Sequence, residues 1–246
     1  MVLQYIAFQL FIDWPALLLF CRSMNPRDKV LRFAADKISG LDLTHPVRVG
    51  IDGVSASGKT FFADELAEVL RSFGHKVIRA GLDGFHNPPE IRHRRGSMSV
   101  EGYVEDSFNY SAVQDCVLIP LGPGGNLRIR EQVYNHKIDA IQENKWANIE
   151  PDSILVFEGV MLFRDDLSDY FDFKILLETS HSVSLERAKI RDLAHFGDLK
   201  TLESKYCQRF LPGQDLYIKQ CMPDRLADLI VNNEDWNAPE IKKVRA

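Results

Sequence analysis

The sequence predicts an α/β protein built on a parallel β-sheet with crossover helices. Short apolar runs alternate along the chain with segments of helical periodicity, a pattern typical of parallel sheets covered by helices. A glycine-rich loop joins the first apolar run, VRVGI, to a helix-like segment, FFADELAEVL. The chain has 246 residues, which suits one large α/β domain, and it contains no repeat, low-complexity tract or evident linker.

Five apolar runs are expected to form the strands of a five-stranded parallel sheet. They lie at residues 47–51, 76–81, 153–159, 173–178 and 228–233. Helices are expected between and after them, at 60–73, 109–118, 132–147, 182–195 and 201–208. Residues 85–110 are rich in Pro, Gly, Ser, His and Arg and are interpreted as an ordered functional loop region, and LGPGGN at 121–126 as a turn.

The first 23 residues are apolar but contain Gln4, Gln9, Asp13 and Pro15. A membrane span needs about 20 mostly apolar residues without a central acid, and a signal peptide needs a positive start and a cleavage site. We therefore expect a docked amphipathic helix or accessory segment, with a weak membrane-surface element as the alternative and a span ranked last. Met24 opens a helix-like pattern that could itself begin a protein. Residues 1–45 are thus expected to form an N-terminal helical extension and 46–246 the main domain.

Charge and cysteine usage exclude several classes of protein. The net charge of −5 gives no overall positive field for nucleic acid, although local basic clusters could bind small anions. The four cysteines are widely spaced and form no CxxC pair, so no zinc site or disulfide framework is expected. This usage favours a reducing cytoplasm. The sequence leaves open whether the chain forms a homo-oligomer.

The glycine-rich loop fits the phosphate-binding pattern GxxxxGK(S/T). Its residues are Gly53, Val54, Ser55, Ala56, Ser57, Gly58, Lys59 and Thr60. Glycines let successive backbone N–H groups face one anion, and the start of a helix adds unpaired N–H donors. Lys59 can reach the β- and γ-phosphates of a nucleotide, and the Thr60 hydroxyl can hold Mg²⁺. The alternative is a glycine-rich turn without function.

Asp83 follows the second predicted strand, in LDGFHNPPEIRHRRG. Ligands of open parallel sheets bind at the carboxyl ends of strands, so a carboxylate here could accept a proton from a substrate hydroxyl. The alternative is a turn aspartate, because Asp-Gly is a common turn pair. Phe85 could stack on a substrate ring or lie in the core, and His86 could bond to backbone or to substrate.

Charged residues farther along add three hypotheses. Arg92, Arg94 and Arg95 form a positive cluster that could bind phosphate or carboxylate, or simply a solvated loop face. Glu158 ends the apolar run SILVFEG, where a Mg²⁺-orienting carboxylate is expected, or else a strand-end residue capping the next segment. Arg187 and Arg191 share one face of a predicted helix and could clamp ATP phosphates, although such faces are usually only solvated.

These motifs, in this order, resemble the uridine kinase-like group of P-loop kinases, related to phosphoribulokinase and bacterial-type pantothenate kinase. The resemblance rests on GIDGVSASGKT, LDGFHNP, RRG, EGYVEDSF, FEGV, the RAKIRD helix and ADLIVNN, and covers roughly residues 45–235. It implies the three-layer P-loop NTPase fold with a helical lid, and a kinase that uses ATP and Mg²⁺ on a small hydroxylated molecule. It assigns Asp83 as catalytic base, Thr60 and Glu158 to Mg²⁺, and Arg187 and Arg191 to the lid.

The acceptor side departs from the nucleoside-phosphorylating members. Where these carry YDF…THxR, this chain reads VYNHKIDA, and residues 209–223 resemble a bacterial and fungal subgroup labelled uridine kinase by similarity. Candidate substrate contacts are Phe85, His86, Arg95, Tyr103, His136 and Arg209. Uridine or cytidine is the expected acceptor, and pantothenate, a sugar or a sugar phosphate is the alternative.

Two other classes of function remain. A GTPase should carry a guanine-reading NKxD, but only NKW at 144–146 appears, which argues for ATP. A non-catalytic ATP-binding regulatory module would have no need of Lys59, Asp83 and Glu158 together.

Overall fold

The computed structural model describes residues 24–143 and 145–245, and its centre is a twisted sheet with strand order β10-β9-β8-β1-β7-β2. Five of these strands run parallel to one another, as expected, and β10 pairs antiparallel with β9 at one edge. The strands are β1 (Val47–Gly53), β2 (Val77–Gly81), β7 (Ile154–Glu158), β8 (Phe173–Glu178), β9 (Leu229–Asn232) and β10 (Glu240–Val244). All five predicted strands are therefore confirmed, and β10 was not predicted.

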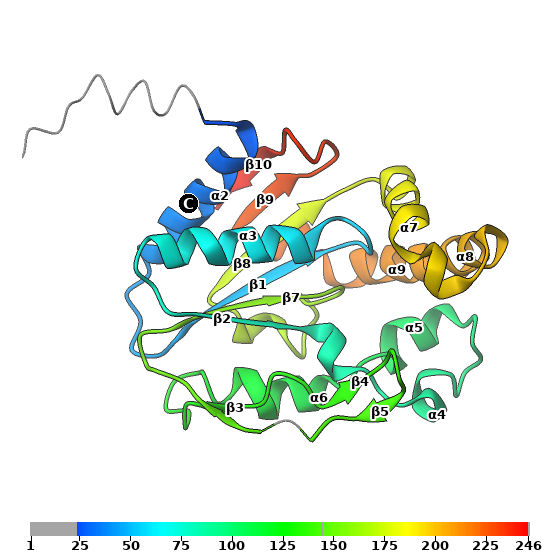
Figure 1. Ribbon diagram of the computed structural model, residues 1–246, viewed down its shortest axis with the longest axis horizontal. Helices are drawn as coiled ribbons and strands as arrows, with labels where there is room; N and C mark the ends of the chain where they lie inside the picture. Colours follow the sequence, from blue (N-terminus) through cyan, green and yellow to red (C-terminus); the bar gives the residue numbers. More distant parts are fainter. Residues whose placement is uncertain (1–23, 144, 246) are drawn as a thin grey trace, which may run out of the picture.

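Helices cover both faces of the sheet, which gives the three layers. Those longer than one turn are α2 (Pro26–Ser39), α3 (Lys59–Ser72), α5 (Val100–Asp106), α7 (His181–Phe196), α8 (Leu199–Lys205) and α9 (Leu211–Cys221). Shorter helical turns are Leu82–Phe85, α4 (Pro89–Arg92), α6 (Tyr110–Val113), Gln114–Leu118, Ser168–Tyr170, Tyr206–Phe210 and α10 (Pro223–Leu226). In Figure 1, α7 and α8 lie beyond the carboxyl ends of the strands, where a lid belongs.

Two apolar clusters hold the layers together. One lies between the sheet and α2 and α3 and contains Val49, Ile51 and Phe62. The other lies on the opposite face, under α5, α6 and α9, and contains Phe157 and Tyr217. β1 is buried on both faces, and its buried residues include two charged ones, Arg48 and Asp52.

The predicted helices at 60–73, 109–118 and 182–195 are confirmed to within two residues at each end. The predicted helix at 201–208 is part of a longer helical stretch that continues through α9. The LGPGGN segment is a turn. Residues 85–110 are ordered and include α4 and α5.

The predicted helix at 132–147 is wrong, because this segment contributes strands to two small two-stranded antiparallel sheets. β4 (Tyr134–Asn135) pairs with β5 (Ala140–Ile141), and β6 (Ala147–Asn148) pairs with β3 (Arg128–Ile129). The side chain of Asn135 accepts a hydrogen bond from the backbone N–H of Lys137 at 3.0 Å, and Asp139 has a φ of 46°. Asn and Asp stabilise turns in these ways, and here they override the helical periodicity.

The N-terminal helix α2 packs on α3, and its buried residues, which include Val30 and Leu31, belong to the same cluster as β1. Asn25 caps α2 by accepting a hydrogen bond from the N–H of Asp28 at 2.8 Å. The expectations for residues 1–23 lie outside the described residues, and the division at residue 45 remains a prediction. Within the described ranges, no helix is long and apolar enough to cross a membrane.

Candidate active site

The glycine-rich loop lies between β1 and α3, at the carboxyl edge of the sheet. Gly58 has a φ of 95°, and a Cβ there would approach Trp236 and Asn233 to 2.9 Å, so only glycine fits without displacement. Lys59 is buried, and its Nζ donates to the carbonyl of Val54 at 2.7 Å. Burial lowers the pKa of Lys59, while the charges of Glu158 and Asp52 act in the opposite direction. The loop thus presents a cation at the start of a helix, as a phosphate site requires.

Two oxygen donors meet beside this loop. The Thr60 hydroxyl donates to Oε1 of Glu158 at 3.4 Å, and Gly81 gives the carboxylate room, because a Cβ there would lie 3.0 Å from that oxygen. Burial raises the pKa of Glu158, and the charge of Lys59 opposes this. No cluster of three or more metal-ligating acids, histidines or cysteines occurs in the part of the chain that the structure describes. A pair of oxygen donors suits Mg²⁺, which binds proteins through few side chains and keeps waters and phosphate oxygens as its other ligands.

Asp83 lies in the helical turn that follows β2, and it is exposed to solvent. In the sheet, Gly81 of β2 lies opposite Glu158 of β7, so Asp83 is two residues beyond this pairing. Its negative charge adds to burial in raising the pKa of Glu158. Asp83 is therefore an accessible carboxylate close to Thr60 and Glu158, the candidate metal-binding pair.

Two histidines accompany Asp83. The ring of His86 lies 4.3 Å from that of His136, measured between centroids, and its Nδ1 lies 3.0 Å from the carbonyl oxygen of Asp83. Burial lowers the pKa of His86 to about 4, and the charge and carbonyl of Asp83 oppose the shift. The imidazole is therefore neutral at neutral pH, and its Nδ1–H donates to the Asp83 carbonyl. His136 comes from the hairpin where the sequence predicted a helix.

Phe85 lies in the core, so the stacking alternative is wrong. Its side chain has no exposed surface and packs against Phe157, with ring centroids 6.3 Å apart. A fully covered ring offers no face to a substrate.

Three other acceptor-side candidates make contacts around α5. Nε of Arg95 pairs with Asp106 at 2.9 Å, and Arg94 pairs with the same carboxylate. Tyr103 is buried, and burial raises its pKa to about 12. Arg209 is also buried, lies 5.6 Å from the Tyr103 ring centroid, and donates to the carbonyl of Ser99 at 3.3 Å. In this state of the molecule these three side chains hold α5 in place.

The two predicted lid arginines differ in their contacts. Arg187 donates to the carbonyls of Ser57 at 3.2 Å and Asn233 at 2.9 Å, so it joins the loop to the end of β9. Nε of Arg191 pairs with Asp192 at 2.7 Å, and its Nη2 donates to the Tyr206 hydroxyl at 3.3 Å.

Tyr206 and Ser184 connect the lid to the glycine-rich loop. The Tyr206 hydroxyl lies 3.2 Å from Ser55 Oγ, and Ser184 Oγ donates to the Ser55 carbonyl at 2.6 Å. Sequence reasoning singled out neither residue, because nothing local marks a tyrosine or serine that contacts a loop more than 120 residues away.

An aromatic pair beside the loop was also missed. The exposed ring of Phe61 meets that of Trp236 edge-on, with centroids 5.2 Å apart. Trp236 follows the ADLIVNN motif by three residues, which is the one sequence signal that could have drawn attention to it. The pair places an apolar surface next to the phosphate-type loop.

The parallel sheet, the loop and the lid define a nucleotide-binding P-loop kinase. Residues 48–238 match the Phosphoribulokinase / Uridine kinase family, and the chain belongs to this family. It is an ATP-dependent small-molecule kinase that uses a metal ion.

Two relatives agree with this assignment, and one solved structure shares the fold. The chain is 30% identical over 176 residues to uridine-cytidine kinase B of Dictyostelium discoideum, covering 71% of this chain and 70% of the relative. It is 28% identical over 167 residues to pantothenate kinase of a Bradyrhizobium strain, covering 62% of this chain and 52% of the relative. A solved structure of a possible uridine kinase from Bacillus stearothermophilus has a TM-score of 0.64 at 20% identity, covering 81% of this chain and 96% of the other. This last similarity concerns the fold alone.

Proposed function

We propose that this chain transfers the γ-phosphoryl group of MgATP to a hydroxyl of uridine or cytidine, giving the nucleoside monophosphate and ADP. One observation carries the proposal: Asp83 is exposed and lies beside Lys59 and Glu158, so a base, a phosphate-binding cation and a metal-type carboxylate share one edge of the sheet. The similarity to a uridine-cytidine kinase supports the choice of acceptor.

In this proposal the loop residues 53–60 bind the nucleotide phosphates. Lys59, now held by the Val54 carbonyl at 2.7 Å, exchanges this partner for phosphate oxygens when ATP enters. Thr60 and Glu158 hold Mg²⁺, which when bound neutralises phosphate charge. Phe61 and Trp236 offer an apolar surface for the nucleotide base.

Asp83 acts as the base. It orients the acceptor hydroxyl and accepts its proton while the new oxygen–phosphorus bond forms and the bond from the γ-phosphorus to the bridging oxygen breaks. His86 donates a hydrogen bond to the backbone carbonyl of Asp83. This bond fixes the backbone at Asp83 and so keeps the carboxylate directed into the site.

Arg187 and Arg191 supply positive charge from the lid. Arg187 is already anchored at the carbonyl of Ser57, beside Lys59. Arg191 would have to leave Asp192 to reach the phosphates, so lid movement on α7 is part of the proposal.

His136 stacks on His86 next to Asp83 and is the best-placed side chain for contact with an acceptor ring or hydroxyl. Arg95, Tyr103 and Arg209 would contribute only if α5 and the lid repack. Pantothenate is the second candidate acceptor, favoured by the pantothenate kinase similarity. A cytoplasmic location and a homo-oligomeric state stay predictions.

The test is ADP release from MgATP with each of several acceptors, measured against a blank without acceptor. The panel is uridine, cytidine, pantothenate, ribulose 5-phosphate, glycerate and fructose. Release that is highest with uridine or cytidine supports the proposal, and a preference for pantothenate replaces the acceptor while keeping the chemistry. Tight MgATP binding with a flat panel would instead favour a binding module without turnover.

A further inference from the structure

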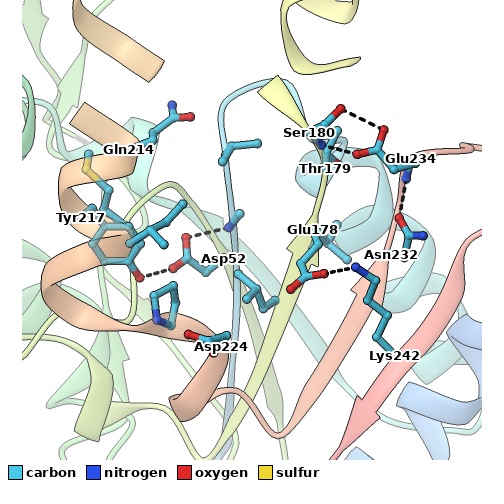
Figure 2. A pocket seen from close by; sticks show the side chains of 17 residues that line it. Asp52, Glu178, Thr179, Ser180, Gln214, Tyr217, Asp224, Asn232, Glu234 and Lys242 are labelled. Carbon is cyan, nitrogen blue, oxygen red and sulfur yellow. Dashed lines mark hydrogen bonds and ion pairs between the residues drawn. The ribbon is translucent and has the colours of Figure 1, made fainter. Parts of the chain in front are cut away.

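A pocket of about 480 Å³ lies behind the glycine-rich loop, on the face of the sheet opposite α3. Figure 2 shows its walls, which come from the ends of β1, β8 and β9 and from α9 and α10. Asp52, Gly53 and Val54 form one wall, so an occupant would contact the backbone from which the loop rises. Asp83, Lys59 and Thr60 do not line it. Its volume is within the range of sites that bind small molecules.

The contacts of Gln214 indicate that this pocket binds a ligand. Only 2% of this residue is exposed, and its Nε2 donates to the Tyr103 hydroxyl at 3.2 Å, while Oε1 has no partner within the described structure. Thr179, on the opposite wall, also has a buried hydroxyl oxygen without a partner. Buried polar atoms in folded proteins are nearly always hydrogen-bonded, and both residues line the pocket, so a ligand there is a candidate for the missing partner.

The charges at the pocket exclude a phosphate-bearing ligand. Four carboxylates, those of Asp52, Glu178, Asp224 and Glu234, line the pocket together with a single cation, Lys242. That cation pairs with Glu178 at 2.6 Å, which leaves Asp224 and Glu234 as excess negative charge beside the buried Asp52. A negative field favours neutral or cationic ligands and repels anions, in contrast to the Lys59 side of the loop.

The remaining walls are apolar. Met161, Leu176, Ile218 and Pro223 line the pocket between the buried end at Gln214 and the charged rim. Such side chains favour a flat apolar body, and the few polar atoms then fix its orientation.

We propose that this pocket is a second ligand site, which binds a small planar nitrogen compound, neutral or cationic, with an apolar ring against these walls and an N–H group donating to Gln214. A free nucleobase or an aryl amidine has this chemistry. The site is separate from the nucleotide site in front of the loop, so both can be occupied at once.

The test is isothermal titration of the full chain, saturated with MgADP to block the nucleotide site, with benzamidine as the probe and benzoate as an anion of the same size. We expect saturable benzamidine binding, with benzoate at least about tenfold weaker. Absence of saturable benzamidine binding, or equal affinity for the two probes, would overturn the proposal.

Substitutions in the pocket test whether benzamidine binds there. Ile218→Trp places a larger side chain from the exposed part of α9 at the pocket and should abolish benzamidine binding, whereas Ile119→Trp, at a similarly exposed isoleucine away from the pocket, should leave it unchanged. Gln214→Met should weaken binding by about tenfold through the lost acceptor. Circular dichroism checks that each variant is folded. Binding that survives Ile218→Trp, or that is unaffected by Gln214→Met, would show that this pocket is not the site.

Discussion

Thr60 and Glu158 approach each other to 3.4 Å between Oγ1 and Oε1, although 98 residues separate them in the sequence. The contact forms because α3 follows β1 directly after the glycine-rich loop and Glu158 ends the neighbouring strand β7. The carboxylate is partly buried, and burial raises its pKa, so its ionised form depends on the positive charge of Lys59 and on any bound cation.

Replacing Glu158 by Gln should therefore weaken metal use more than nucleotide binding. The amide keeps the shape but loses the charge, so we expect turnover to fall by about a hundredfold or more. The Mg²⁺ concentration for half-maximal activity should rise. Because the pKa of Glu158 is raised, that concentration should increase in wild type as the pH falls, and this dependence should flatten in the variant. Glu68→Gln, on the exposed side of α3, is the control, and equal effects of both substitutions would refute the metal assignment.

Asp83→Asn should separate binding from chemistry. The amide cannot accept the proton of the acceptor hydroxyl, so turnover should fall by about a hundredfold to ten-thousandfold. The dissociation constant for MgATP, measured by titration without acceptor, should stay within a few-fold of wild type, because Asp83 does not hold the phosphates. Turnover that survives within a few-fold would show that another group, or water, takes the proton.

Much of this arrangement could be predicted from the sequence, because the dominant signals are local. The inner strand β7 and most of β8 and β9 are buried and contain dense apolar runs, and the glycine-rich loop is a short contiguous pattern. β10 was missed because all its residues are exposed and the sequence EIKKV carries no apolar run. The helix predicted at 132–147 failed because turn formation by Asn135 and Asp139 outweighed periodicity.

From the sequence, the site could be predicted only for residues that lie at the ends of strands. Asp83 follows β2 and Glu158 ends β7, and these strands are neighbours in the sheet, so the proximity of the two residues follows from topology. Whether Phe85 stacked on a ligand or lay in the core depended on Phe157, far along the chain. The contact of Tyr206 with Ser55 likewise depends on how the lid packs, which no local pattern encodes.

His86 should make the folded state sensitive to acid. Its pKa is lowered to about 4 in the folded protein, while an unfolded chain has the ordinary value near 6.5. Between these values the unfolded chain binds the proton and the folded one does not, so stability is lost as the pH falls from 6.5 towards 4. The loss attributable to His86 is at most about 3 kcal/mol.

Urea unfolding of wild type and His86→Gln at several pH values between 4.5 and 7 measures this effect. The variant should lose less stability on acidification than wild type, and His195→Gln, at an exposed histidine, should behave like wild type. Parallel curves for wild type and His86→Gln would show that His86 is not buried in its neutral form.

Arg27 should link the N-terminal helix to nucleotide binding. Its guanidinium carbon lies 4.0 Å from the Trp236 ring centroid, its Nε donates to Glu65 at 2.5 Å, and its Nη1 donates to the Trp236 carbonyl at 3.2 Å. Arg27 lies outside the segment that matches the family, whereas Trp236 lies inside it and covers Gly58 of the loop. The N-terminal helix thus supports the loop through one side chain.

Arg27→Met keeps the apolar stem and removes the charge and its hydrogen bonds. We expect a loss of about 2–3 kcal/mol in the free energy of unfolding. Because Trp236 is then less firmly held, the KM for ATP should rise several-fold while kcat changes less. Arg71→Met is the matched control, since Arg71 lies on the exposed side of α3 and pairs only locally with Glu68 and the Val77 carbonyl. A stability loss with an unchanged KM would mean that Arg27 anchors α2 without positioning the loop.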